Sequence, residues 1–133
     1  MPRERLEELA GLSALRRERS LAELSRASAE CSRLRVEIDD LRDAVTAARL
    51  DAARSGDILQ ALGASRFASW AERKLAMLNI ALAARMAEWQ ECREEAARAH
   101  GQSDVLGRLL AAQRKSLRLL SERKRAAEMP PDT

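Results

Sequence analysis

The segment "SGDILQALGAS", residues 55 to 65, holds the strongest cluster of helix-breaking residues between the two ends of the chain. Gly56 suits the position just after a helix, and Asp57 can cap a short turn. Ser65 is a suitable first residue for the next helix. All three prolines lie at the extreme ends of the sequence, so none interrupts its interior. This segment therefore predicts one turn between two long helices.

The composition favours the same architecture. Charged residues make up 34% of the 133 residues and hydrophobic ones 46%, while only 2% are aromatic. A predominance of Ala, Leu, Arg and Glu is typical of coiled coils, and the lack of β-branched clusters argues against a sheet. We therefore predict an all-α fold, a long antiparallel two-helix coiled-coil hairpin forming one domain over residues 1–133. The predicted helices span about 4–55 and 65–128, with the turn at 56–64.

Heptad spacing supports this prediction, because steps of three and four residues keep one stripe of a helix against its partner. In the first helix the stripe consists of Leu24, Ala27, Cys31, Leu34, Ile38, Leu41, Val45, Ala48 and Ala52. In the second it consists of Leu75, Leu78, Leu82, Arg85, Trp89, Cys92, Ala96, Ala99, Ser103, Leu106, Leu110, Gln113, Leu117 and Leu120. A weaker interruption at residues 101–107 predicts a soft point or a kink rather than a break.

Folding the chain at the predicted turn pairs positions whose numbers add up to about 123. Leu41 then faces Leu82, Cys31 faces Cys92, and Leu34 faces Trp89. Large layers alternate with small ones in this arrangement, which lets two helices pack without voids.

Catalysis and metal binding are not expected. His100 lies eight residues after Cys92, about 12 Å along a helix, which is too far for both to hold one zinc ion. The two cysteines are better explained as small buried hydrophobes. The chain lacks the common catalytic and phosphate-binding motifs, and its carboxylates are expected on solvated helix faces. We predict a non-enzymatic protein without a cofactor.

Charge and hydropathy indicate a cytoplasmic location. The N-terminus has no apolar core typical of a secretory signal, and the cysteines lack a CxxC motif. The longest strongly apolar run, residues 75–84, is about half a membrane span, so the protein is expected to be peripheral to a membrane at most. Acidic and basic residues are interspersed at a net charge of +3, which disfavours DNA or RNA as a partner.

A second apolar stripe follows the first turns of the second helix. Its bulky members, with Ala84 and Ala87 continuing the pattern, are Phe67, Trp70, Met77 and Ile80. A contiguous exposed apolar surface usually marks an interface. Two structural explanations remain open: a locally wide seam, or the segment "ILQAL" (residues 58–62) folding back over the stripe.

The end of the hairpin that carries both termini offers another candidate surface. Leu6, Leu9, Leu12 and Leu15 step by three, so they wind round the helix instead of forming one stripe. Residues 108–128 carry seven Lys or Arg against two Glu. The candidate partner-binding residues at this end are Leu9, Leu12, Leu15, Arg114, Lys115, Arg118, Arg123, Lys124 and Arg125. A heptad stutter and a solvated basic tail are the alternative explanations.

An antiparallel hairpin of this size, rich in Arg, Ala and Glu, resembles the FliJ family of flagellar type III export proteins. The bulky Trp89 is followed by Arg/Glu-rich turns and a basic "QRKSLRLLSERKR" tail at residues 113–125, as in the C-terminal helix of that family. The YscO-type injectisome stalk proteins are similar in form.

The resemblance implies a stalk whose terminal end sits in the pore of a hexameric export ATPase. Its other parts would contact the cytoplasmic domain of the export gate and export chaperones. The alternative, from a different class, is a coiled-coil scaffold or chaperone that self-associates through the second apolar stripe.

Overall fold

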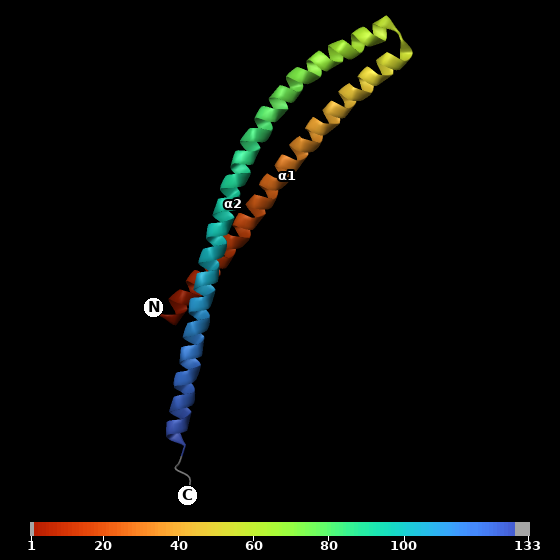
Figure 1. Ribbon diagram of the computed structural model, residues 1–133. Helices are drawn as coiled ribbons and strands as arrows, with labels where there is room; N and C mark the ends of the chain where they lie inside the picture. Colours follow the sequence, from red (N-terminus) through yellow and green to blue (C-terminus); the bar gives the residue numbers. More distant parts are fainter. Residues whose placement is uncertain (1, 130–133) are drawn as a thin grey trace. The chain divides into compact units, whose positions relative to one another are not determined.

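The computed structural model describes residues 2–129, which form two long helices, α1 (Arg3–Ser55) and α2 (Ile58–Glu128) (Figure 1). No strand occurs within these residues. The predicted all-α helical hairpin is therefore confirmed.

Gly56 and Asp57 alone make the turn between the helices. Gly56 has a positive φ of 68°, and its N–H donates a 3.3 Å hydrogen bond to the carbonyl of Ala52. This left-handed glycine ends α1, because a residue with a Cβ is disfavoured in that conformation. The Asp57 carboxylate then accepts a 3.0 Å hydrogen bond from the N–H of Leu59, which caps the first turn of α2.

The start of α2 differs from the predicted one, because the helix begins at Ile58 and not near Ser65. Gly63 therefore lies inside the helix, where a glycine costs only about 1 kcal/mol relative to alanine. Extending the helix through this segment buries Ala64 beside Ala52 of α1. The cap at Asp57 and this burial together offset the low helix propensity of the glycine. The helix also continues without a break through Gly101 and Gly107.

The contacts of the chain fall into two compact units. The turn unit is Glu23–Arg93, and the terminal unit combines Met1–Ala22 with Glu94–Thr133.

The core of the turn unit is a cluster of aliphatic side chains from both helices. Leu34 and Ile38 of α1 are buried against Leu78 of α2. Partly buried residues pack round this cluster: Leu41, Leu75, Ala81 and Leu82. Except for Ala81, all these residues belong to the two predicted heptad stripes, so this part of the predicted seam is confirmed.

The register of the turn unit differs from the predicted one. The hydrogen bond to Glu88 is the main cause of the raised pKa of Arg85, and Glu30 and Cys31 of α1 make smaller electrostatic contributions. These contributions agree with the core cluster, in which Ile38 is buried against Leu78 and the two numbers add up to 116. Near the turn, Ala52 lines a shallow groove together with Ala64. Facing residue numbers therefore add up to about 116, one heptad less than the predicted 123.

The predicted pairs of this unit are corrected accordingly. In the observed register, Cys31 faces Arg85 rather than Cys92, and Trp89 faces Ala27 rather than Leu34. The cause is the earlier start of α2, which moves the turn back along the chain. The same stripes remain buried, because a shift of seven residues brings each heptad position onto an equivalent one.

The terminal unit is packed through smaller side chains. Its buried residues include Ser13 and Ser20 of α1 and Ala96 and Ala99 of α2. Leu6, near the start of α1, is the one large aliphatic side chain buried among the described residues of this unit. Small and hydroxyl-bearing layers bury less apolar area than leucine and isoleucine, so this unit is held together less strongly per layer than the turn unit.

Candidate partner-binding surfaces

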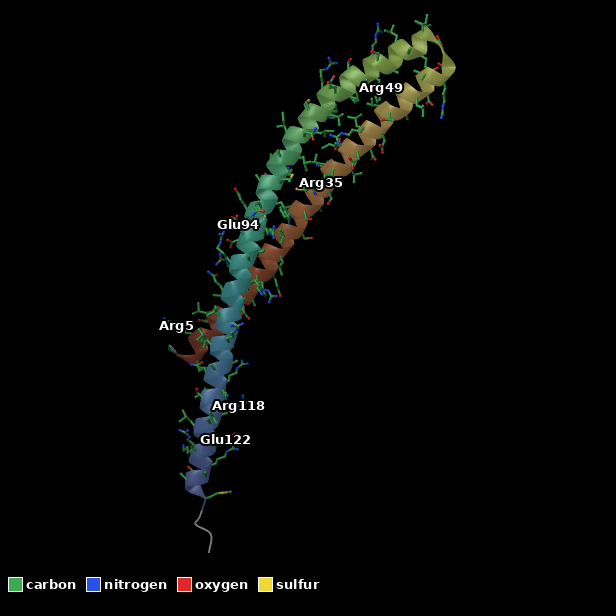
Figure 2. All side chains as sticks on the ribbon, in the orientation of Figure 1. Arg5, Arg35, Arg49, Glu94, Arg118 and Glu122 are labelled. Carbon is green, nitrogen blue, oxygen red and sulfur yellow. The ribbon has the colours of Figure 1, made fainter. Side chains whose placement is uncertain are left out.

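The C-terminal overhang, Arg114–Glu128, is the part of α2 in which every residue is exposed. Figure 1 shows α2 continuing past the start of α1, and Figure 2 labels Arg118 and Glu122 on this stretch. Arg3, at the start of α1, lines a shallow pocket at the base of the overhang together with Arg114, Leu117, Arg118 and Ser121. Beyond that pocket the helix has no antiparallel partner.

The six basic residues of the overhang are distributed round the helix, and three of them share one side. Successive helical residues are about 100° apart, so Arg114, Arg118 and Arg125 gather on one side. Leu117 and Leu120 lie roughly 110° round the helix from these arginines and occupy positions of the heptad seam. Glu122 and Glu128 are the only acidic residues here, against six basic ones. The predicted basic cluster therefore lies in one exposed, unpaired helical segment.

Apolar side chains of both helices line a groove of about 640 Å³ in the terminal unit. Leu9 and Leu12 of α1 form one side, and Val105 and Leu106 of α2 form the other. Leu15 is exposed but does not line this groove. The structure thus brings together two of the three predicted leucines. Val105 was missed by the sequence analysis, although Val105, Leu109 and Leu119 each come directly before a leucine of the seam and so share one side of α2.

A polar network borders the groove. The Nε of Arg16 donates a 3.1 Å hydrogen bond to Glu95, and its Nη1 donates a 2.6 Å hydrogen bond to Gln102. Arg98 also binds the Glu95 carboxylate, through Nη2 at 3.1 Å. The hydrogen bond from Arg16, followed by that from Arg98, lowers the pKa of Glu95 below its usual range. The two arginines share one carboxylate, so this border of the groove keeps a net positive charge.

The turn-side stripe lies on α2 in the turn unit. Trp70, Met77 and Ile80 are exposed, with fractions of 49%, 66% and 72%. Phe67 differs from the other predicted members because it is only partly exposed. Its ring stacks on that of Trp70, with centroids 5.8 Å apart and an interplanar angle of 24°. Phe67 therefore packs against the Trp70 ring and contributes less than Trp70 to the exposed surface.

No segment covers this stripe within residues 2–129. The "ILQAL" segment does not fold back, because it forms the first turns of α2 and its Ile58 and Leu59 are themselves exposed. A locally wide seam does not account for the stripe either, since Met77 and Ile80 are mostly in solvent.

Neither a metal site nor a membrane-spanning helix occurs among the described residues. Among residues 2–129, no three His, Cys, Asp or Glu side chains are placed to hold one metal ion. Cys31 is buried, Cys92 is partly buried, and both are free thiols. In the same part of the chain, neither helix has an apolar stretch long enough to cross a bilayer.

Comparison of the sequence with protein-family models and curated proteins, and of the structure with solved structures, found no significant match.

Proposed function

We propose that this chain is a non-enzymatic, cytoplasmic coiled-coil stalk of a type III export system, in either its flagellar or its injectisome form. Its terminal end binds a hexameric export ATPase. Its other surfaces contact the cytoplasmic domain of the export gate and export chaperones. The resemblance to FliJ-like and YscO-like proteins supplies the identity of these partners.

The observation that carries this proposal is the C-terminal overhang. A single helix about 10 Å in diameter with side chains fits a narrower opening than a helix pair does. Its six basic side chains complement a ring with acidic walls, and its unpaired leucines supply an apolar contact. Both properties belong to a fully exposed segment that α1 reaches only at its base, through Arg3.

Charge reversal within the overhang tests this function. Replacing Arg118, Arg123 and Arg125 by Glu should weaken binding to the ATPase ring, with the larger loss at low salt because exposed charges are screened at high salt. The matched control reverses Arg35, Arg42 and Arg49, which are three exposed arginines on α1. The measurement is retention of each variant by the immobilised ATPase hexamer, with the helical content checked by circular dichroism. Equal retention of both triple variants contradicts the proposal.

A scaffold or chaperone that self-associates is the second candidate function. The exposed turn-side stripe favours it, because monomeric proteins rarely leave such a row of large apolar side chains in solvent. Absence of any ATPase binding, combined with self-assembly of the purified chain, would favour this second function over the stalk.

A further inference from the structure

The turn-side stripe is part of a longer heptad pattern on α2. Alternating steps of four and three residues lead from Arg66 to Glu91 through Trp70, Arg73, Met77, Ile80, Ala84 and Ala87. All eight residues are exposed, and α1 packs on a different face of α2, the one that carries Leu75, Leu78 and Leu82. The stripe therefore has the spacing of a coiled-coil seam, but no helix within residues 2–129 packs on it.

The two halves of this stripe complement each other in charge and in size. Arg66 lies at one end and Glu91 at the other, and neither forms an ion pair among residues 2–129. The largest side chain, Trp70, lies as far from the centre of the stripe as the small Ala87. In the reverse direction, the stripe thus offers a carboxylate (Glu91) opposite Arg66 and a small residue (Ala87) opposite Trp70.

We infer that a second copy of this chain packs on the stripe in the antiparallel direction, with the two-fold axis between Met77 and Ile80. Met77 then faces Ile80 of the second copy, Trp70 faces Ala87, and Arg66 faces Glu91. The same register places Arg73 opposite Ala84, which leaves room for the arginine stem. In a two-fold interface every contact occurs twice, so each favourable pair contributes its free energy twice.

The charges exclude a parallel pair in register. In that arrangement Arg66 would face Arg66 and Glu91 would face Glu91, and like charges in contact are strongly unfavourable. Stacking on Phe67 already limits the rotamers of the Trp70 ring in the single chain. Less side-chain entropy is therefore lost when Trp70 is buried in the dimer. The contact runs from residue 66 to residue 91, about 38 Å of helix.

This inference rests on only one part of the proposed function, namely that the turn-side stripe is a binding surface. If the stalk also contacts its export gate through Trp70, that contact and the dimer exclude each other, because both cover the same side chain.

Sedimentation equilibrium of the full chain tests the dimer. We expect a reversible monomer–dimer equilibrium, weakened at least about tenfold by Arg66→Glu and, separately, by Glu91→Arg. The double variant Arg66→Glu/Glu91→Arg should restore the dimer, since it only exchanges the two ends of each ion pair. Arg35→Glu, on α1, is the control for a changed net charge. Circular dichroism verifies that every variant keeps its helices.

A chain that stays monomeric up to about 100 µM overturns the inference, since an affinity weaker than that corresponds to no specific interface. If the double variant dimerises as weakly as the single variants, the antiparallel register is wrong. Neither result depends on the ATPase, whose binding is measured through the overhang. Failure of the dimer and failure of the stalk are therefore distinguishable.

Discussion

Arg16 and Glu95 are 79 positions apart in the sequence and form an ion pair in the terminal unit, with the arginine Nε 3.1 Å from the carboxylate. In the predicted register, residue 107 would face Arg16. Glu95 would then lie about 18 Å away along the helix, beyond the reach of an arginine. This pair therefore rules out the predicted register in the terminal unit, as the packing of Ile38 on Leu78 does in the turn unit.

The first prediction concerns the pH dependence of this ion pair. Because Arg16 and Arg98 lower the pKa of Glu95 in the folded chain, the carboxylate stabilises the fold above its unfolded pKa. That contribution is lost as the pH falls through the lowered, folded-state pKa. Glu95→Gln should therefore melt at a lower temperature than the parent at neutral pH, and the difference should vanish in acid. A difference that is constant from neutral to acid pH would show that the charge of Glu95 is not responsible.

The second prediction tests the register through thiol chemistry. Cys31 faces position 85 and lies about one heptad, roughly 10 Å, from the level of Cys92, too far for a disulfide. Mild oxidation should therefore leave both native thiols free within a monomer, as shown by thiol titration and peptide mapping. In Arg85→Cys, a bond between positions 31 and 85 should form.

Cys31→Ser in the Arg85→Cys background is the control, because it removes the buried partner of the new disulfide. A bond between Cys31 and Cys92 in the native chain would restore the originally predicted register.

The third prediction compares two seam positions of the turn unit. Ile38 is buried in the aliphatic cluster, so Ile38→Ala should lower the free energy of unfolding by about 2–5 kcal/mol. Trp89 is only partly buried and its ring lies 5.5 Å from the Arg93 guanidinium, so Trp89→Ala should cost less than about 3 kcal/mol. Urea denaturation followed by circular dichroism measures both values. A larger loss at Trp89 than at Ile38 would place the tryptophan in the core.

The fourth prediction concerns two glycines with opposite backbone requirements. Gly107 lies inside α2, and a Cβ added there meets no atom within 4 Å. Gly107→Ala should therefore stabilise the chain by about 0.5–1 kcal/mol. Gly56 has a positive φ, so Gly56→Ala should destabilise it by about 1–2 kcal/mol, although a Cβ there also meets no atom within 4 Å. Thermal melts of the two variants should therefore shift in opposite directions, and a shift in the same direction would contradict the assigned turn.

The fifth prediction concerns the buried hydroxyl of Ser13, which has no hydrogen-bond partner among residues 2–129. Ser13→Ala removes an unsatisfied polar group and improves helix propensity, so it should stabilise the terminal unit by about 1 kcal/mol. Ser121→Ala, an exposed position in α2, controls for the change in propensity. Equal gains at both positions would mean that the Ser13 hydroxyl has no energetic cost.

The helical hairpin and its buried stripes were predictable from the sequence alone. Proline-free helices and a heptad repeat are local properties, and Gly56 carries its turn signal within a few residues. The exposure of Trp70, Met77 and Ile80 also follows from their position off the repeat. The basic cluster was recognisable by composition, before its position on an overhang was known.

Only the tertiary structure decided the register and the extent of each helix. Cys31 fits equally well opposite residue 92 or residue 85, because a shift by seven residues exchanges one seam position for another. The choice depended on whether Gly63 ends a helix or lies within one. There the Asp57 cap and the burial of Ala52 and Ala64 outweigh a propensity cost of about 1 kcal/mol. That balance involves residues on both helices, so a local pattern does not contain it.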